Sequence, residues 1–194
     1  MKHFYFILLL IGFYACANNE EVRALTKEIP NTYVLESTTT AKEGLLYWDN
    51  KKYSGFVYEL NAETGDTLLL ESYYKGLKDG LSKKWYTGNE LMELRHYADG
   101  QKNGEQIAYW VNGNTRFEYT AKDDAYEGEL KEWNEDGFLF HIAHYVNGQE
   151  EGEQKLWYDN GKVRANYVII DGKRYGLLGT KNCVNVSDSI FFNQ

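Results

Sequence analysis

The sequence predicts an all-β protein, an elongated single-layer antiparallel meander built from tandem β-hairpin repeats of about 24 residues. Three observations predict this fold. Glycines recur at a nearly constant interval, Asx-Gly dipeptides separate short segments rich in aromatic and β-branched residues, and proline occurs only once. Aromatic and β-branched residues favour strands, and glycine after Asn or Asp favours tight turns between them. No segment has the pattern of a crossover helix.

The glycine column defines the repeat. Its spacing is constant from the second member onward, and only the first interval is longer, by a single position. A fixed period of this kind indicates units that cannot bury an apolar face alone and that gain stability from their neighbours. We therefore interpret these glycines as structural: Gly55, Gly80, Gly104, Gly128, Gly152 and Gly176.

An aromatic column keeps step with the glycines, five positions after each of four of them. Its members are Trp85, Tyr109, Trp133 and Trp157. Equivalent side chains in successive hairpins lie two strands apart, at roughly 9 to 10 Å, and we expect them to stack on one face. The column is either a core ladder between hairpins or an exposed stripe that binds a peptide or a glycan.

Two sets of Asx-Gly dipeptides divide each unit into two short strands. Both residues of such a pair tolerate positive φ, so the sequence predicts two-residue type I′ turns at both ends of the hairpins. One set is Asn112-Gly113, Asp136-Gly137 and Asn160-Gly161, and the other is Asp99-Gly100, Asn147-Gly148 and Asp171-Gly172.

The N-terminus has the pattern of an export signal. A basic start precedes an apolar run over residues 4–13, which is too short to span a bilayer as a helix, and Ala15 precedes Cys16. This arrangement resembles a bacterial lipobox, with departures at Phe13 and Tyr14. The resemblance implies that Cys16 is lipidated and anchors the protein in the bacterial cell envelope, as an outer-membrane lipoprotein facing the periplasm or the surface. Secretion without a lipid is the alternative.

The chain divides into four expected parts. Residues 1–15 are the signal peptide, and residues 16–43 are the lipidated N-terminus, a linker and an N-terminal cap. Residues 44–179 are the repeat domain, which opens with a worn half-unit over 44–53, and residues 180–194 are a C-terminal cap or tail. A lipidated Cys16 leaves Cys183 as the only other cysteine, so no intramolecular disulfide is expected.

Several functional classes are disfavoured by composition and motifs. The formal net charge of −8 works against phosphate-backbone contacts, so nucleic acid is not an expected partner. His141 and His144 have an odd separation, which places them on opposite faces of a strand and argues against a metal site. We find no nucleophile elbow, phosphate loop or zinc-protease signature. The sequence therefore predicts no catalytic residues, metal or cofactor.

The repeat unit, with Gly-x(4)-Trp, a mid-unit Asn-Gly turn and a closing Tyr-x(2)-Gly-x(3)-Gly, resembles the variant MORN repeat (membrane occupation and recognition nexus). The array is also similar to the bacterial YwqK-like antitoxins of toxin–antitoxin systems. The best-matched units begin at Gly80, Gly128 and Gly152, whereas the unit at Gly104 departs with Tyr109 and Asp124. The resemblance covers about residues 44–176. It implies an elongated sheet used for contact with protein or membrane lipid.

Together these observations favour a non-enzymatic, envelope-anchored module for protein binding or scaffolding, with a protein partner and with the membrane contacted only through the lipid. Two alternatives stay open. One is an antitoxin or immunity-like protein that binds a toxin, and the other is a protein that binds glycan or envelope polymer through the aromatic column.

Overall fold

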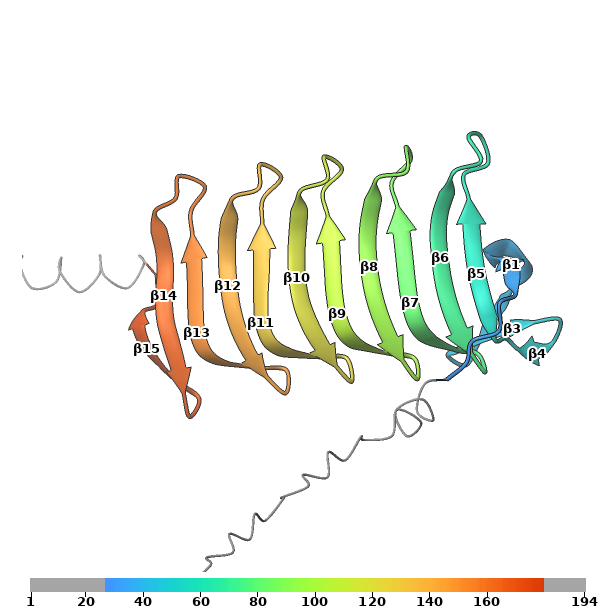
Figure 1. The fold of residues 1–194 in the computed structure, drawn as a ribbon. Coiled ribbons are helices and arrows are strands. Elements are labelled where there is room, and N and C mark those ends of the chain that lie inside the picture. The colour runs from blue at the N-terminus through green and yellow to red at the C-terminus, as the bar shows by residue number, and fades with distance from the viewer. Residues whose placement is uncertain (1–26, 180–194) are drawn as a thin grey trace, which may run out of the picture.

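The computed structural model describes residues 27–179, which form an open sheet of 12 strands and a separate sheet of three strands (Figure 1). From the second strand of the large sheet onward, the strands follow chain order and pair antiparallel with their neighbours. The predicted all-β meander is confirmed. Within residues 27–179, no helix is long and apolar enough to cross a membrane. Cys16, the predicted signal and residues 180–194 lie outside the described residues.

The repeat array consists of hairpins in which a strand carrying the repeat glycine is followed by a strand without it. The strands are β5 (Gly55–Leu60), β6 (Thr67–Tyr74), β7 (Leu77–Trp85), β8 (Leu91–Ala98), β9 (Gln101–Tyr109), β10 (Thr115–Lys122), β11 (Ala125–Trp133), β12 (Leu139–Val146), β13 (Gln149–Trp157), β14 (Val163–Ile170) and β15 (Lys173–Leu177).

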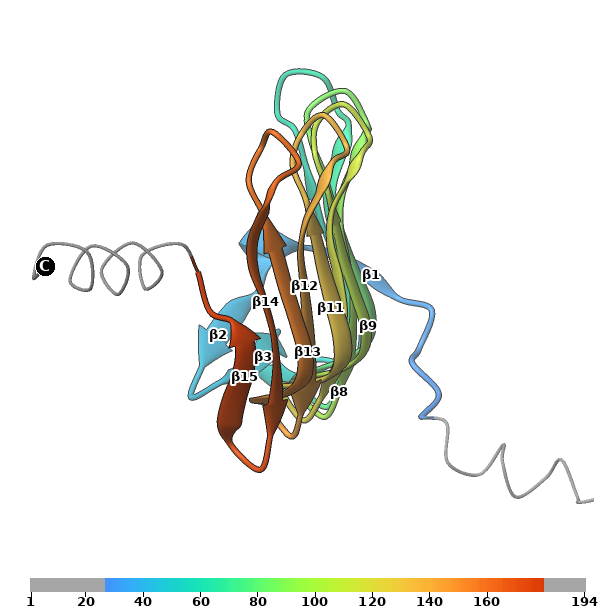
Figure 2. The ribbon, with the colours of Figure 1, turned by 90° about the vertical axis from the view of Figure 1, so that its left-hand side faces the viewer.

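The N-terminal segment caps the first edge of the array. β1 (Tyr33–Leu35) pairs in parallel with β5 and is followed by the 3-10 helix η1 (Glu36–Thr38). β2 (Thr40–Lys42), β3 (Leu45–Trp48) and β4 (Lys51–Lys52) form the separate sheet, which lies on the concave side of the curved array (Figure 2). Residues 44–53 thus belong to this small sheet, and the array itself begins at Gly55.

A small apolar core joins the cap to the array. The buried members are Val34 of β1, Tyr53, Val57 of β5 and Tyr73 of β6, and Leu46 of β3 packs against them. The cap therefore covers the concave face of the first hairpin, and because it lies at the β5 end of the array (Figure 1), that face is open farther along.

Four of the repeat glycines lie at irregularities in the sheet: Gly80, Gly104, Gly128 and Gly152. Gly104, with φ of 98°, is inside β9 at the point where pairing with β8 jumps from Arg95–Gln106 to Tyr97–Lys102. Such a positive φ is readily adopted only by glycine. The His96 ring lies opposite, with its Nδ1 2.9 Å from the carbonyl oxygen of Glu105.

The two sets of Asx-Gly dipeptides form different turns. Between β8 and β9, Asp99 and Gly100 both have positive φ, as a type I′ turn requires. Between β9 and β10, only Gly113 has positive φ, so the expected type I′ turn is wrong there. This connection is a longer loop, closed by backbone hydrogen bonds between Trp110 and Asn114 and between Gly113 and Trp110. The Asn112 side chain stabilises it by accepting from the Asn114 N–H at 3.0 Å.

Candidate functional site

A strip of aromatic side chains runs along the uncovered part of the concave face. Cross-strand pairing places these residues on the same face as Tyr73, which the cap covers. They come from β8, β10, β11, β12 and β14. We call this surface the concave aromatic strip, and it consists of Tyr97, Phe117, Tyr119, Tyr126, Tyr145 and Tyr167.

The centre of the strip is a continuous series of ring contacts. Ring centres are 5.8 Å apart for Phe117 and Tyr119, 4.6 Å for Tyr119 and Tyr126, and 4.9 Å for Tyr126 and Tyr145. The Arg95 guanidinium lies 4.8 Å from the Phe117 ring centre and donates a 3.1 Å hydrogen bond to the Tyr119 hydroxyl. These contacts fix the rings in tilted and edge-on arrangements, which aromatic pairs prefer.

Small or flexible side chains lie beneath the rings and are almost completely buried. Gln106 is 0% exposed, Ala108 and Ala121 are 2% exposed, and Ala143 is 0% exposed. The Gln106 amide nitrogen donates to the His96 carbonyl oxygen at 2.8 Å, whereas its Oε1 atom has no hydrogen-bond partner within residues 27–179. A single-layer sheet thus obtains a core on this face because long aromatic side chains cover their short neighbours.

The strip presents neutral phenols bordered by polar side-chain contacts. Burial raises the pKa values of Tyr97, Tyr145 and Tyr167, so these hydroxyls stay protonated near neutral pH. At the borders, His141 Nδ1 lies 2.7 Å from Glu132 Oε2, and the Arg174 guanidinium lies 3.0 Å from Glu150. The resulting surface suits contact with a partly polar polypeptide, since each phenol combines apolar area with a hydrogen-bonding group.

The predicted aromatic column occupies a different place. Trp85, Tyr109, Trp133 and Trp157 are the last residues of β7, β9, β11 and β13, and all four are half-buried. Within the described residues none of them contacts another ring, so the expected stack does not form. The physical reason is distance: two strand spacings exceed the roughly 4.5 to 7 Å of aromatic contacts. The centre of the concave aromatic strip forms ring contacts because Tyr119, Tyr126 and Tyr145 come from adjacent strands.

The residues next to the column tie successive hairpins together. The Tyr86 hydroxyl donates to the Tyr109 carbonyl oxygen at 2.9 Å, and the Trp110 indole N–H donates to the Trp133 carbonyl oxygen at 3.0 Å. Trp157, the last member of the aromatic column, lines a hollow of about 340 Å³ between two loops, together with the exposed Phe138. The column is therefore partly structural.

Sequence reasoning missed most of the strip. Tyr97 and Tyr145 are the tyrosines of the closing Tyr-x(2)-Gly-x(3)-Gly pattern, but Phe117, Tyr119, Tyr126 and Tyr167 belong to no pattern found in the sequence. A signal for them was present. The two-residue turns pair Ala121 with Tyr126 and Tyr145 with Glu150 on the concave face. Alternation along the strands, with Gln154 paired to Tyr167, then places Tyr119 and Tyr167 on that same face.

The histidines and acidic residues do not converge. His141 lies on the concave face beside Glu132, and His144 lies on the convex face with Nδ1 3.1 Å from the Glu151 carbonyl oxygen, as the odd separation predicts. Within residues 27–179, no group of three His, Cys, Asp or Glu side chains is placed to hold a metal ion.

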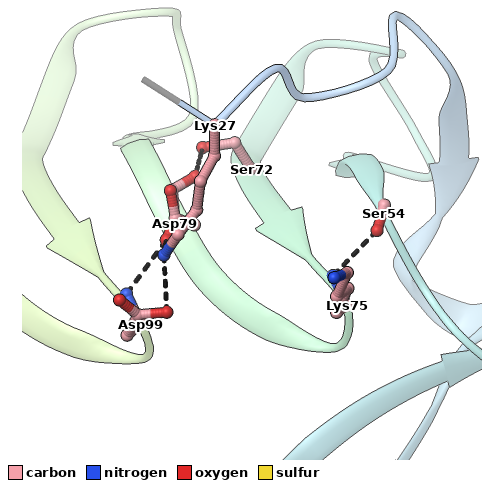
Figure 3. Close-up of polar contacts among 6 residues, drawn as sticks. All are labelled: Lys27, Ser54, Ser72, Lys75, Asp79 and Asp99. Carbon is pink, nitrogen blue, oxygen red and sulfur yellow. Dashed lines mark hydrogen bonds and ion pairs between the residues drawn. The ribbon is translucent and has the colours of Figure 1, made fainter. Parts of the chain in front are cut away.

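The convex face carries a lysine bridge near the cap. Lys27 Nζ lies 2.7 Å from Asp79 and 2.5 Å from Asp99, and it holds the N-terminal segment across two hairpins (Figure 3). Asp79 also accepts from the Asp99 N–H at 3.0 Å. One ammonium group thus binds between two carboxylates from successive repeats.

Comparisons with known proteins give no further guidance: no family model matches this chain, and no curated protein matches it in sequence.

Proposed function

We propose that this chain is a non-enzymatic protein-binding module and that the concave aromatic strip is its docking surface. One observation carries the proposal. Tyr73 is only 7% exposed because the chain's own cap packs on it, whereas Tyr97 and Tyr145, at the equivalent positions of uncovered hairpins, are half-buried. The same face therefore accepts a polypeptide where one is available and is open elsewhere.

The chemistry of the strip supports a protein partner. Tyr126 is 39% exposed, and its ring lies between those of Tyr119 and Tyr145. Rigid tyrosines lose little conformational entropy on binding and are frequent anchors in protein interfaces. Arg95, held against Phe117, adds a cation that is already oriented.

The proposal includes the location and the wider class of the protein. A lipid on Cys16 would tether the sheet to the bacterial envelope through the segment before Lys27. The MORN-like repeat pattern is consistent with a surface that binds a partner without catalysing a reaction. An antitoxin or immunity protein is one form of such a module, in which the docked protein is a toxin.

Site-specific photo-crosslinking in intact cells tests the docking surface. The photoreactive p-benzoylphenylalanine replaces Tyr126 on the strip or, as a matched control, Thr120, which is exposed on the convex face of the adjacent strand. We expect a discrete protein adduct from position 126 and none from position 120. The adduct should occur in the membrane fraction and move to the soluble fraction when Cys16→Ala is added.

Two results would contradict the proposal. Equal adducts from both positions would mean that the concave face is not selective. The absence of any protein adduct from positions 126, 97 and 145 would remove the protein-binding role and favour a glycan or polymer ligand. Membrane retention of the Cys16→Ala variant would contradict the lipid anchor alone.

A further inference from the structure

A hollow of about 630 Å³ lies between the cap and the concave face of the first two hairpins. We call it the cap hollow. Ala41 of β2 and Leu46 of β3 line one side, and residues of β6, β7 and β8 line the other. Trp85, the first member of the predicted aromatic column, forms part of its wall. The hollow thus begins where the open concave face meets the cap.

The floor of the cap hollow is a closed polar network. Glu71 is 5% exposed, and its Oε1 atom accepts from Lys78 Nζ at 2.5 Å and from the Ser82 hydroxyl at 3.1 Å. Its Oε2 atom accepts from the Tyr73 hydroxyl at 2.7 Å. Because Lys78 neutralises Glu71, the floor adds little net charge to the hollow.

The rim carries carboxylates without partners. Glu36 and Glu59 line the hollow and are exposed, and within the described residues neither side chain forms an ion pair or a hydrogen bond. Lys84 also lines the hollow without an ion pair inside residues 27–179. Outside the floor network, two carboxylates therefore face one ammonium group, so the hollow favours a cation by one charge.

The Glu36 carboxylate acts on the interior of the hollow. Burial is the main cause that raises the pKa of the Tyr73 phenol, the Glu71 charge adds to it, and the Glu36 charge contributes from η1. The Glu36 charge therefore reaches the Tyr73 hydroxyl at the floor of the hollow.

The walls are apolar and aromatic. Leu46, Leu69 and Met92 supply aliphatic surface, and the Trp85 indole and Tyr86 phenol supply rings. A long aliphatic stem fits such walls, and a cationic group at its end can contact both an aromatic face and a carboxylate. The chain holds one lysine in a comparable way on its convex face, where Lys27 lies between Asp79 and Asp99 (Figure 3).

We propose that the cap hollow receives a lysine or arginine side chain of the protein that docks on the concave aromatic strip. This inference rests on the proposed function and adds a specificity element to it. The aliphatic stem packs between Leu69 and Met92, and the cation meets the Glu36 and Glu59 carboxylates.

Nuclear magnetic resonance of the full chain, labelled with ¹⁵N-tryptophan, tests the inference. The chain has five tryptophans, and the Trp85 indole signal is assigned with Trp85→Phe. The probes are the N-acetyl methylamides of lysine, arginine, norleucine and glutamate. We expect saturable shifts of the Trp85 signal with lysine and arginine, with little change at the other four, and affinity for norleucine at least tenfold weaker.

The matched variants separate charge from shape. The double variant Glu36→Gln, Glu59→Gln should weaken lysine binding about tenfold and leave norleucine unchanged. Glu135→Gln, which alters an exposed carboxylate in the β11–β12 loop, should leave both lysine binding and norleucine binding unchanged. Norleucine binding as tight as lysine, tighter binding of glutamate, or equal shifts at all five tryptophans would overturn the inference.

The result is separable from the test of the docking surface. Selective adducts from position 126 without lysine binding at Trp85 would overturn the role of the cap hollow and leave the proposed function standing. Selective lysine binding without adducts from the strip would overturn the proposed function, and with it the assignment of the lysine to a docked protein.

Discussion

The repeat glycines differ in what surrounds them, although all have positive φ. At Gly80, with φ of 89°, an added Cβ atom would lie 2.9 Å from the Ser72 Oγ atom. That hydroxyl is 2.5 Å from the Asp79 carbonyl oxygen and 2.9 Å from that of Leu81. At Gly128, with φ of 75°, nothing lies within 4 Å of the added atom.

This difference predicts unequal costs for the same substitution. Gly128→Ala should lower the free energy of unfolding by about 1 kcal/mol, the backbone strain alone. Gly80→Ala should lower it by about 2 to 3 kcal/mol, because crowding also disturbs the Ser72 hydrogen bonds. Urea titration measures both, and Ser72→Ala in the Gly80→Ala background should recover part of the loss. Equal costs at the two glycines would exclude crowding as the cause.

At the scale of elements, the Glu71 network joins β6 to β7 beneath the cap. Burial alone would raise the pKa of Glu71, but hydrogen bonds and the charge of Lys78, with hydrogen bonds from Tyr73 and Ser82, bring it below the usual 4.5. A carboxyl group whose pKa is lower in the folded state stabilises the fold above its unfolded pKa. That contribution is lost as the pH falls through the folded pKa.

The pH dependence of stability therefore has a predictable sign. Wild type should exceed Glu71→Gln in free energy of unfolding above about pH 5, and the difference should shrink as the pH falls below about 4. Denaturant titrations across this range measure it. Glu150→Gln, which removes a more exposed ion pair with Arg174, is the control and should have a smaller effect. A difference that does not change with pH would mean that Glu71 acts only through packing.

The elements were predictable from the sequence to the extent that they repeat. The strands from β6 to β14 follow from the glycine interval and the Asx-Gly dipeptides. The type of each turn does not follow from the sequence, because Asn112-Gly113 and Asp99-Gly100 are alike but form different turns. The Asn112 side chain stabilises the longer loop by accepting a hydrogen bond from the Asn114 N–H. The small sheet of the cap was not predicted, since residues 44–53 share repeat features but form their strand pairs with β2 and with one another. They contact the array through backbone hydrogen bonds of Leu46 and Tyr53 with Gly76.

The candidate site belongs to the scale of the whole molecule, and this limits its prediction from sequence. Alternation can place Tyr119 and Tyr167 on one face, but it cannot say that this face is concave or that the cap covers only its first hairpin. Both properties come from the bending of the sheet and from the packing of Leu46 against the small core that contains Tyr73. The aromatic column that ends at Trp157 was predicted because its members recur with the repeat. They lie two strands apart, and this distance prevents their rings from stacking.

The period of the repeat can be tested by removing a whole unit. Deletion of residues 103–126 joins Lys102 to Glu127, which returns Gly128 to the position of Gly104 and keeps each later side chain on its own face. Deletion of residues 103–125 retains Tyr126 and moves Gly128 one position later, so Glu127 falls where positive φ is required. The same 23-residue deletion also moves the retained side chains from Tyr126 to Trp133 to the opposite face of the sheet.

We expect the whole-unit deletion to keep the strand signal in circular dichroism and a cooperative thermal transition. Its sheet should be shorter by two strand spacings, roughly 9 to 10 Å, which small-angle scattering measures as a smaller maximum dimension. The deletion that retains Tyr126 removes less of the chain but should melt at a much lower temperature or fail to fold, because it breaks both the glycine position and the alternation. Equal stability of the two variants would mean that neighbour contacts tolerate a change of register and that the period does not determine the sheet.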